Sequence, residues 1–233
     1  SPSIFPIVKE VMDVAVMLWN KFFAHKENGC RTQKLSVGKM VLENLKKYKV
    51  VLASNSPRRK ELLGGLGIGY EVKTMPDIDE SYPDGLCMEE VPVYIARSKA
   101  DAYRPLMQPD ELIITADTIV WLDGVVMGKP KDEEEACDML RRLSGQTHQV
   151  VTGVCLTTID RQQSFATVTD VTFDRLTEEE ITHYVSRYQP MDKAGAYGIQ
   201  EWIGYVGVRS IKGSYFNVVG LPIQRLYQEL KRL

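Results

Sequence analysis

Strand-like and helix-like segments alternate along most of this chain, but hairpin turns join some neighbouring strands directly. The Asp123-Gly124 pair lies between two strand-like runs and is a two-residue hairpin signal. A second hairpin is expected to turn near Lys212-Gly213. Strict alternation favours a parallel sheet with crossover helices, whereas a hairpin requires an antiparallel pair. The sequence therefore predicts one α/β domain built on a mixed sheet with flanking helices.

Local signals place the ends of several elements. Ser56 is a suitable N-cap and Pro57 a suitable first helical residue, while Thr177 and Glu180 form a capping box. The expected strands cover residues 49–53, 111–115, 118–122, 125–127, 149–159 and 164–173, and the expected helices begin near 57, 93, 132, 177 and 222.

The charge balance limits the classes of partner. The 29 Lys and Arg nearly balance the 31 Asp and Glu, so the chain lacks the positive excess of a dedicated nucleic-acid or polybasic membrane binder. Residues 26–60 nevertheless carry ten Lys and Arg against two Glu. Single-stranded nucleic-acid binding there ranks last, because Tyr48 is the segment's only aromatic residue. We therefore expect no stable nucleic-acid partner and no membrane partner.

The cysteines and histidines form no recognisable metal or disulfide pattern. The four Cys and three His are scattered along the chain, and no C-x-x-C pair occurs. This usage is typical of a reducing compartment, so a cytoplasmic location is expected.

The first forty residues are expected to form a separate extension. Residues 4–23 are largely apolar but contain Lys9, Glu10 and Asp13, which argues against a membrane span or signal peptide and favours an amphipathic helix. Such a helix docks on its own domain or on a dimer partner, or it lies outside the functional unit that begins near Met40. We expect a helical extension at 1–40 and a domain at 41–233.

Three cations crowd the first turn of the helix that begins at Pro57. Arg58, Arg59 and Lys60 follow the Ser56 N-cap, where the helix dipole already presents about half a positive charge. A phosphate would accept hydrogen bonds from the free N–H groups and the guanidinium groups together. The alternative is that the side chains extend into solvent. No G-x-x-x-x-G-K-[ST] pattern occurs, which excludes a P-loop.

A second group of polar residues surrounds Asp117. Asp117 and Thr118 follow the apolar run 112–114, and Lys129 lies where the return strand of the first hairpin ends. The hairpin register sets Thr118 opposite Lys129, so alternation puts Asp117 and Lys129 on opposite faces. They share a site only if the strand bulges or ends at Asp117, which we expect. Such a carboxylate is a metal ligand or general base, or alternatively a turn-forming Asp.

A run of small residues at 192–200 carries one aromatic and one amide side chain. Its glycines and alanines permit a close approach of the backbone to a ligand. Tyr197 is a candidate to pack on a flat ring, and Gln200 can both donate and accept hydrogen bonds. A glycine-rich loop packed against a helix would give the same pattern.

Together, these runs resemble the Maf family of house-cleaning nucleoside triphosphate pyrophosphatases. The resemblance begins near Lys49 and rests on S-N-S-P-R-R (54–59), A-D-T (116–118), G-K-P (128–130) and D-K-A-G-A-Y-G-I-Q (192–200), in that order. It implies cleavage between the α- and β-phosphates, with release of the nucleoside monophosphate and pyrophosphate, and a divalent cation, Mg²⁺ before Mn²⁺ or Co²⁺. It also implies a homodimer and an elongated fold with a deep central cleft, similar to that of inosine triphosphate pyrophosphatases.

The resemblance implies a role for each matching residue. Asp117 matches the catalytic base, and Arg58, Thr118 and Gln200 match positions associated with substrate choice. The complete set comprises the catalytic residues Asp117, Lys99, Lys129 and Glu80, the substrate-binding residues Ser54, Ser56, Arg58, Arg59, Thr118, Tyr197 and Gln200, and the metal ligands Asp117 and Glu80.

The form A-G-A-Y-G-I-Q resembles the branch of the family that hydrolyses dTTP and UTP. A Gln amide can match the adjacent carbonyl and imide N–H of uracil or thymine, and an unmatched buried polar edge costs about 1 to 3 kcal/mol. Glu201 departs from the family pattern, in which a glycine is expected. If that glycine has a positive φ, the loop must be rebuilt around Glu201.

A nucleotide-binding regulator of cell division or septum formation, without turnover, is the alternative function. Cations alone suffice to hold a triphosphate, whereas a carboxylate beside phosphates repels them unless it holds a metal or activates water. The acidic residue Asp117 therefore separates the two hypotheses.

Overall fold

The computed structural model describes residues 41–76 and 78–233. The helical extension predicted at 1–40 lies outside the described residues, so its boundary with the domain stays a prediction. Residues 42–233 form one unit. Among the residues that the structure describes, no helix is long and apolar enough to cross a membrane.

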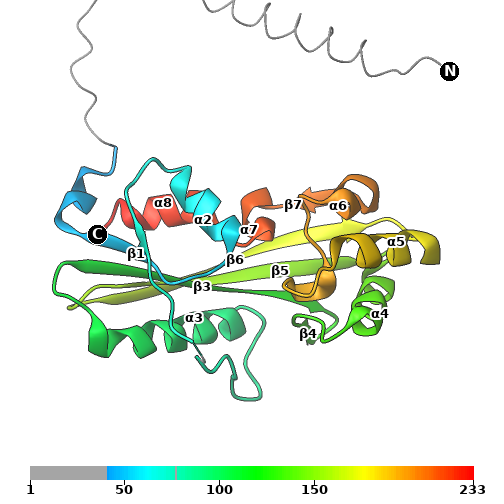
Figure 1. Cartoon of the computed structure of the whole chain (residues 1–233), viewed down its shortest axis with the longest axis horizontal. Helices are drawn as coiled ribbons and strands as arrows, with labels where there is room; N and C mark the ends of the chain where they lie inside the picture. The colour runs from blue at the N-terminus through cyan, green and yellow to red at the C-terminus, as the bar shows by residue number, and fades with distance from the viewer. Residues whose placement is uncertain (1–40, 77) are drawn as a thin grey trace, which may run out of the picture. The chain divides into compact units, whose positions relative to one another are not determined.

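A seven-stranded mixed sheet runs through this unit (Figure 1). Its strands are β1 Lys49–Leu52, β2 Glu71–Val72, β3 Glu111–Leu122, β4 Val125–Met127, β5 Thr147–Thr157, β6 Gln162–Phe173 and β7 Val208–Lys212. They lie in the order β2-β1-β3-β5-β6-β7, and β4 pairs with another part of β3. β1 is parallel to β2 and β3, whereas the other pairs are antiparallel. The predicted mixed sheet is therefore confirmed.

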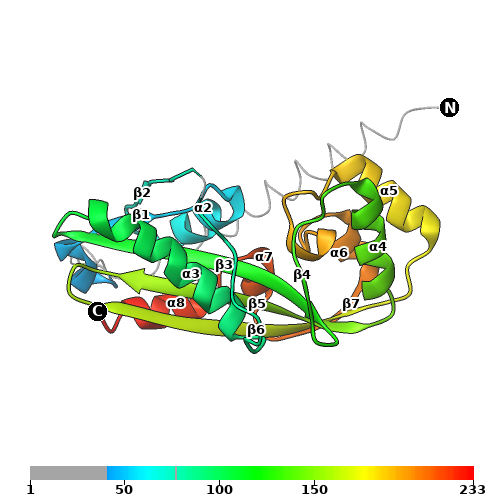
Figure 2. The ribbon, with the colours of Figure 1, turned by 90° about the horizontal axis from the view of Figure 1, so that it is seen from below.

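Helices cover both faces of the sheet (Figure 2). The α-helices are α2 Pro57–Gly64, α3 Glu90–Tyr103, α4 Glu133–Leu143, α5 Glu178–Tyr188, α6 Trp202–Gly207, α7 Tyr215–Val219 and α8 Ile223–Leu230, and the 3-10 helices are η1 Glu43–Lys47, η2 Arg104–Leu106 and η3 Ala194–Ala196. Helices α2, α7 and α8 lie on one face and α3 on the other, while α4, α5 and α6 gather towards the end that carries β4 and β7.

Successive side chains of β3 point to opposite faces of the sheet, so each packs against a different helix. Ile114 packs in a cluster with Leu63 of α2 and with α8 residues, whereas Ile119 packs with Ile95 of α3. Both faces of β3 are therefore buried, in agreement with its nearly continuous apolar sequence. Residues next to each other on this strand point to opposite helical layers.

The helix caps predicted from the sequence are present in the structure. The Ser56 hydroxyl accepts a hydrogen bond from the Arg59 N–H at the start of α2, and Pro57 is its first residue. Thr177 and Glu180 form both hydrogen bonds of the capping box at the start of α5. Helix positions near 57, 132, 177 and 222 are confirmed, and α3 begins three residues before the expected 93.

The hairpin expected near Lys212-Gly213 is wrong. β7 does end at Lys212, but the chain continues into α7 instead of a return strand. The Ser214 hydroxyl caps α7 by accepting from the Asn217 N–H, and the buried Asn217 amide donates to Val150 and Thr167 carbonyls of the sheet. These contacts stabilise a short helix whose aromatic and β-branched residues favour a strand by composition.

Candidate active site

An unpaired stretch in the edge of β3 creates the cleft. β1 pairs with β3 only as far as Ile114, and β4 begins to pair at Val120. In the described part of the chain, no strand occupies this edge between those two residues. A cleft of about 560 Å³ opens there. The eleven site residues predicted from the sequence all line it: Ser54, Ser56, Arg58, Arg59, Glu80, Lys99, Asp117, Thr118, Lys129, Tyr197 and Gln200.

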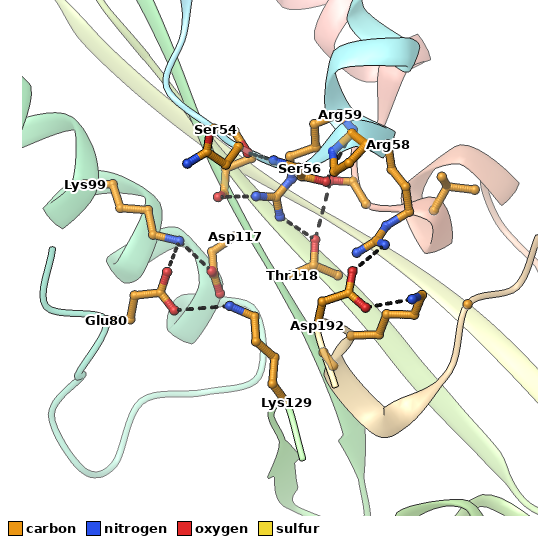
Figure 3. A pocket seen from close by; sticks show the side chains of 18 of the residues that line it. Ser54, Ser56, Arg58, Arg59, Glu80, Lys99, Asp117, Thr118, Lys129 and Asp192 are labelled. Carbon is orange, nitrogen blue, oxygen red and sulfur yellow. Dashed lines mark hydrogen bonds and ion pairs between the residues drawn. The ribbon is translucent and has the colours of Figure 1, made fainter. Parts of the chain in front are cut away.

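The bulge or strand end expected at Asp117 is wrong. β3 runs without interruption, and Asp117 and Thr118 pair regularly with Gly153 and Thr152 of β5. Their side chains therefore lie on opposite faces of the sheet, as alternation requires. Both still reach the cleft, because the cleft lies at an open edge and receives side chains from either face (Figure 3).

Two carboxylates and two lysines meet on the α3 side of β3 (Figure 3). Lys99 of α3 places its ammonium 2.9 Å from Asp117 Oδ1 and 2.7 Å from Glu80 Oε1. Lys129, which follows β4, lies 3.8 Å from Glu80 Oε2. Partial burial of Glu80 opposes its ionisation, but the hydrogen bond and charge of Lys99, with Lys129, outweigh it and hold the pKa of this carboxyl below its ordinary value.

The short Lys99–Asp117 distance depends on how closely α3 approaches the sheet. Gly153, the partner of Asp117 on β5, has no side chain, and a Cβ there would lie 2.3 Å from the backbone of Pro92 in α3. One turn further along α3, the Ala96 carbonyl accepts a hydrogen bond from the Thr115 hydroxyl at 2.6 Å. The glycine therefore lets α3 rest directly on β3 and β5.

On the α2 side, Arg59 is a half-buried cation held by neutral acceptors. Its guanidinium donates to the carbonyls of Gly220 and Ala116, both at 2.9 Å, and to the Thr118 hydroxyl at 3.0 Å. Burial lowers the pKa of Arg59 from its ordinary value, but arginine remains charged at physiological pH. Among the described residues, no carboxylate pairs with it within 4 Å. The charges of Asp117 and Glu80 offset only part of the cost of burying the Arg59 charge, so an anion in the cleft is favoured.

Arg58 is paired with Asp192, which is not among the eleven predicted site residues. The Arg58 guanidinium lies 2.9 Å from Asp192 Oδ2. In the loop before α2, the Ser54 hydroxyl accepts a hydrogen bond from the Ser56 N–H. Lys60, the third cation of the first turn, does not line the cleft. The expectation that all three cations face one anion is therefore wrong for Lys60, because successive helical residues point in different directions.

The small-residue run 192–200 forms the opposite wall of the cleft. Gly195 has φ 68°, and a Cβ on it would lie 2.8 Å from Val120 of β3, so a small residue is required for packing at this position. Tyr197 is 6% exposed, packs edge-to-face on His148 and Phe173, and its hydroxyl pairs with His148 Nε2 at 2.7 Å. Its ring is thus part of the core, and stacking on a bound base stays a prediction.

Gln200 presents an acceptor that has no partner. Its Oε1 atom is buried and makes no hydrogen bond with any described residue. A buried amide oxygen without a donor costs about 1 to 3 kcal/mol, and a ligand with an N–H group would remove that cost. This end of the cleft is therefore suited to the polar edge of a base.

The conflict expected at Glu201 does not exist. Glu201 has φ −96° and ψ 178°, an extended conformation that any residue adopts, so no glycine is needed there. Its carboxylate accepts a hydrogen bond from the Tyr184 hydroxyl and lies 3.2 Å from the Lys193 ammonium. Glu201 is thus integrated into the fold without rebuilding the loop.

Asp117 and Glu80 are the candidate ligands for a divalent cation. The described residues contain no group of three or more His, Cys, Asp or Glu side chains suited to a metal. Mg²⁺ is commonly held by one or two carboxylates together with substrate phosphates and water. Two carboxylates that both contact Lys99 fit an ion of this kind, whose remaining ligands come with the substrate.

Sequence reasoning missed three residues that shape the cleft. Asp192 and Lys193 lie within the quoted run 192–200, and their charges among small residues were the available signal. Gly153 lies in a strand rich in Val and Thr, where a glycine is often the sign of a close approach. What approaches it is not visible in the sequence, because the contacting Pro92 of α3 lies 61 residues earlier.

One family model and two curated relatives match most of this chain. The model of the family described as Maf-like protein matches residues 49–233. A dTTP/UTP pyrophosphatase of Phocaeicola vulgatus is 70% identical over 83% of this chain and 100% of its own length. A protein of the same name from Bacteroides thetaiotaomicron is 66% identical with the same coverage. Among solved structures, a HAM1 protein from Coxiella burnetii is 16% identical, covers 80% of this chain and 100% of its own, and has a TM-score of 0.44.

Proposed function

This chain belongs to the Maf family, and on that premise we propose that it is a nucleoside triphosphate pyrophosphatase that hydrolyses dTTP and UTP. The products are the nucleoside monophosphate and pyrophosphate. Two relatives, at 70% and 66% identity, are named dTTP/UTP pyrophosphatases. We place the activity in residues 41–233. We extend the proposal to modified pyrimidine nucleotides, whose hydrolysis would prevent their misincorporation into nucleic acids.

The observation that carries this proposal is the carboxylate of Asp117 in a cleft lined by five cations. These are Arg58, Arg59, Lys99, Lys129 and Lys193. Cations alone can hold a triphosphate, but a carboxylate among them repels phosphate unless it activates water or shares a metal ion. The arrangement therefore favours hydrolysis over binding alone, and an enzyme over a regulator of cell division.

In the proposed reaction, Asp117 orients a water molecule for attack on a phosphorus of the triphosphate bridge. The Lys99 ammonium, 2.9 Å away, fixes the direction of the Asp117 carboxylate. Arg59 is held by three acceptors, so its charge is in position before the substrate binds. Charges fixed in advance stabilise the negative charge that develops on the phosphate oxygens, and such positioning dominates phosphoryl transfer.

We propose Mg²⁺ as the divalent cation, with Asp117 and Glu80 as its protein ligands. When bound, it would neutralise charge on the phosphate oxygens and help to align the triphosphate. The pairing of Glu80 with both Lys99 and Lys129 would hold this carboxylate at the cleft while leaving the ion's other positions to substrate and water.

Gln200 is the residue that we propose reads the base. Its buried, unpaired Oε1 atom requires a donor, and the imide N–H of uracil and thymine supplies one beside a carbonyl that can accept from the amide nitrogen. Arg58 and Thr118 lie in the same cleft and complete the set proposed for substrate choice. A homodimer and a cytoplasmic location are further proposals: the first follows from the resemblance to the family, and the second from the scattered cysteines.

An assay of pyrophosphate release from a panel of nucleoside triphosphates, with Mg²⁺ present, tests this function. We expect UMP and TMP with pyrophosphate from UTP and dTTP. Release of nucleoside diphosphate and phosphate would refute the site of cleavage. Binding of UTP without any product would favour the non-catalytic regulator. Turnover of purine nucleotides only would refute the role of Gln200 and leave the reaction class in place.

A further inference from the structure

The turn that carries Gln200 is closed by its own backbone. The Glu201 N–H donates to the Gly198 carbonyl at 3.0 Å, so Ile199 and Gln200 are the two central residues of the turn. The Gly204 N–H then donates to the Glu201 carbonyl at 2.9 Å. Ile199 is 6% exposed and anchors the turn in the core. The direction of the Gln200 amide therefore depends on where Gly198 and Glu201 are held.

A buried polar unit holds both ends of this turn. The Tyr184 hydroxyl of α5 accepts a hydrogen bond from the Gly198 N–H at 3.0 Å and donates one to the Glu201 carboxylate. A Cβ on Gly198 would lie 3.0 Å from both Glu201 Cδ and Lys193 Cε, so these side chains pack directly on the backbone of the turn. One hydroxyl and one carboxylate thus link the first and last residues of the turn.

Lys193 supplies the charge that pairs with the half-buried Glu201 carboxylate. It is 8% exposed, and its ammonium lies 3.2 Å from Glu201 Oε1 and 2.7 Å from Asp192 Oδ1. Asp192 in turn pairs with Arg58. A buried ammonium without a carboxylate is costly, and so is a buried carboxylate without a cation. The unit therefore has one favourable arrangement, and it extends from the Gln200 turn to a cation proposed to bind phosphate.

We propose that Tyr184, Lys193 and Glu201 form a positioning unit that fixes the Gln200 amide for recognition of the base, which makes Glu201 a determinant of specificity although it does not touch the base. This role rests on the proposed function of Gln200. None of the three is assigned a catalytic role: Tyr184 and Glu201 contact the turn, and Lys193 contacts Glu201 and Asp192. The effect of Glu201 on the base is therefore expressed through Gln200.

Three variants test the role. Glu201→Gln keeps the shape of the side chain and removes its charge, and Tyr184→Phe removes one hydroxyl. Glu179→Gln, on the exposed side of α5, is the matched control for the charge change. We expect each variant to lower kcat/KM for UTP about tenfold. Glu201→Gln removes the charge that pairs with Lys193, and Tyr184→Phe removes the hydroxyl that links Gly198 to Glu201. The Glu179→Gln protein should keep the wild-type value.

A double-mutant cycle with Gln200→Ala separates positioning from general support of the fold. If Glu201 acts through Gln200, Glu201→Gln should lower kcat/KM and the affinity for UMP, measured calorimetrically, in the wild-type background but by less than about twofold in the Gln200→Ala background. Equal losses in both backgrounds, or no loss in the wild type, would overturn the proposal. If Glu201→Gln does not fold, Tyr184→Phe takes its place in the cycle.

The two readouts also keep this role distinct from the proposed function. A wild-type protein that releases no pyrophosphate from any nucleoside triphosphate would refute the proposed function. The UMP-binding cycle would still decide whether Glu201 acts through Gln200, because it needs no turnover.

Discussion

Replacement of Gly153 by alanine should move α3 away from the sheet and separate Lys99 from Asp117. A Cβ on Gly153 would lie 2.3 Å from the carbonyl carbon of Pro92 and 2.4 Å from the Val93 nitrogen. These are backbone atoms, so no side-chain rotation relieves the contact. To reach 3.4 Å, the lower limit of ordinary contacts, α3 must shift by about 1.1 Å at this point.

The shift has a calculable effect on the site. Lys99 lies two helical turns after Pro92 and on the same side of α3, so a rigid displacement would lengthen its 2.9 Å contact with Asp117 to about 4 Å. A misplacement of about 1 Å can reduce the rate up to about 100-fold. We therefore expect a loss of about 10- to 100-fold in kcat/KM for UTP, and a loss of about 1 to 3 kcal/mol in the free energy of unfolding.

Pyrophosphate release and urea unfolding measure these two effects. Gly69→Ala is the matched control, because Gly69 is exposed and a Cβ there meets no atom within 4 Å. The control protein should keep the wild-type activity. A Gly153→Ala protein with wild-type activity and stability would refute the inference that α3 must rest on Gly153 to place Lys99.

Three further predictions concern the surroundings of the cleft. Burial lowers the pKa of His148 to about 4, so the unfolded chain gains a proton below pH 6.5 that the folded protein does not. Stability should therefore fall by about 3 kcal/mol between pH 6.5 and 4 from this residue, and His148→Gln should remove that part of the decline in urea unfolding. Arg59→Met should lower kcat/KM for UTP by the equivalent of about 2 to 4 kcal/mol in the pyrophosphate assay, because it removes a charge fixed in the cleft. Partial burial of Asp192 opposes its ionisation, but Lys193 and Arg58 outweigh it and hold its pKa below the ordinary value. Asp192→Asn should therefore be less stable than the wild type at pH 7, and the difference should disappear in urea unfolding as the pH falls through the lowered pKa.

Residues close in sequence determine the parts of the fold that were predicted well. The Ser56 cap of α2 and the Thr177–Glu180 box of α5 each need only four consecutive residues. The cleft residues were also predicted as a set, because the motifs resemble a known family. That resemblance indicates which residues belong to the site, but it does not give their positions in space.

The errors arose where distant segments decide the structure. β3 continues without interruption through Asp117, and the cleft forms because β1 ends before this residue and β4 begins after it. Neither limit is encoded near Asp117. The helix α7 replaces the expected strand because Asn217 bonds to carbonyls of β5 and β6. The pairing of Glu201 with Tyr184 likewise joins residues of two different elements.

The most direct test of catalysis in this cleft compares pyrophosphate release from UTP by the wild-type and Asp117→Asn proteins, with Mg²⁺ present. Asparagine keeps the shape of the side chain and its contact distance to Lys99, but it cannot accept a proton from water. We predict UMP and pyrophosphate from the wild type and a rate at least about 100-fold lower from the variant. Release of pyrophosphate by Asp117→Asn at the wild-type rate would contradict the role of Asp117.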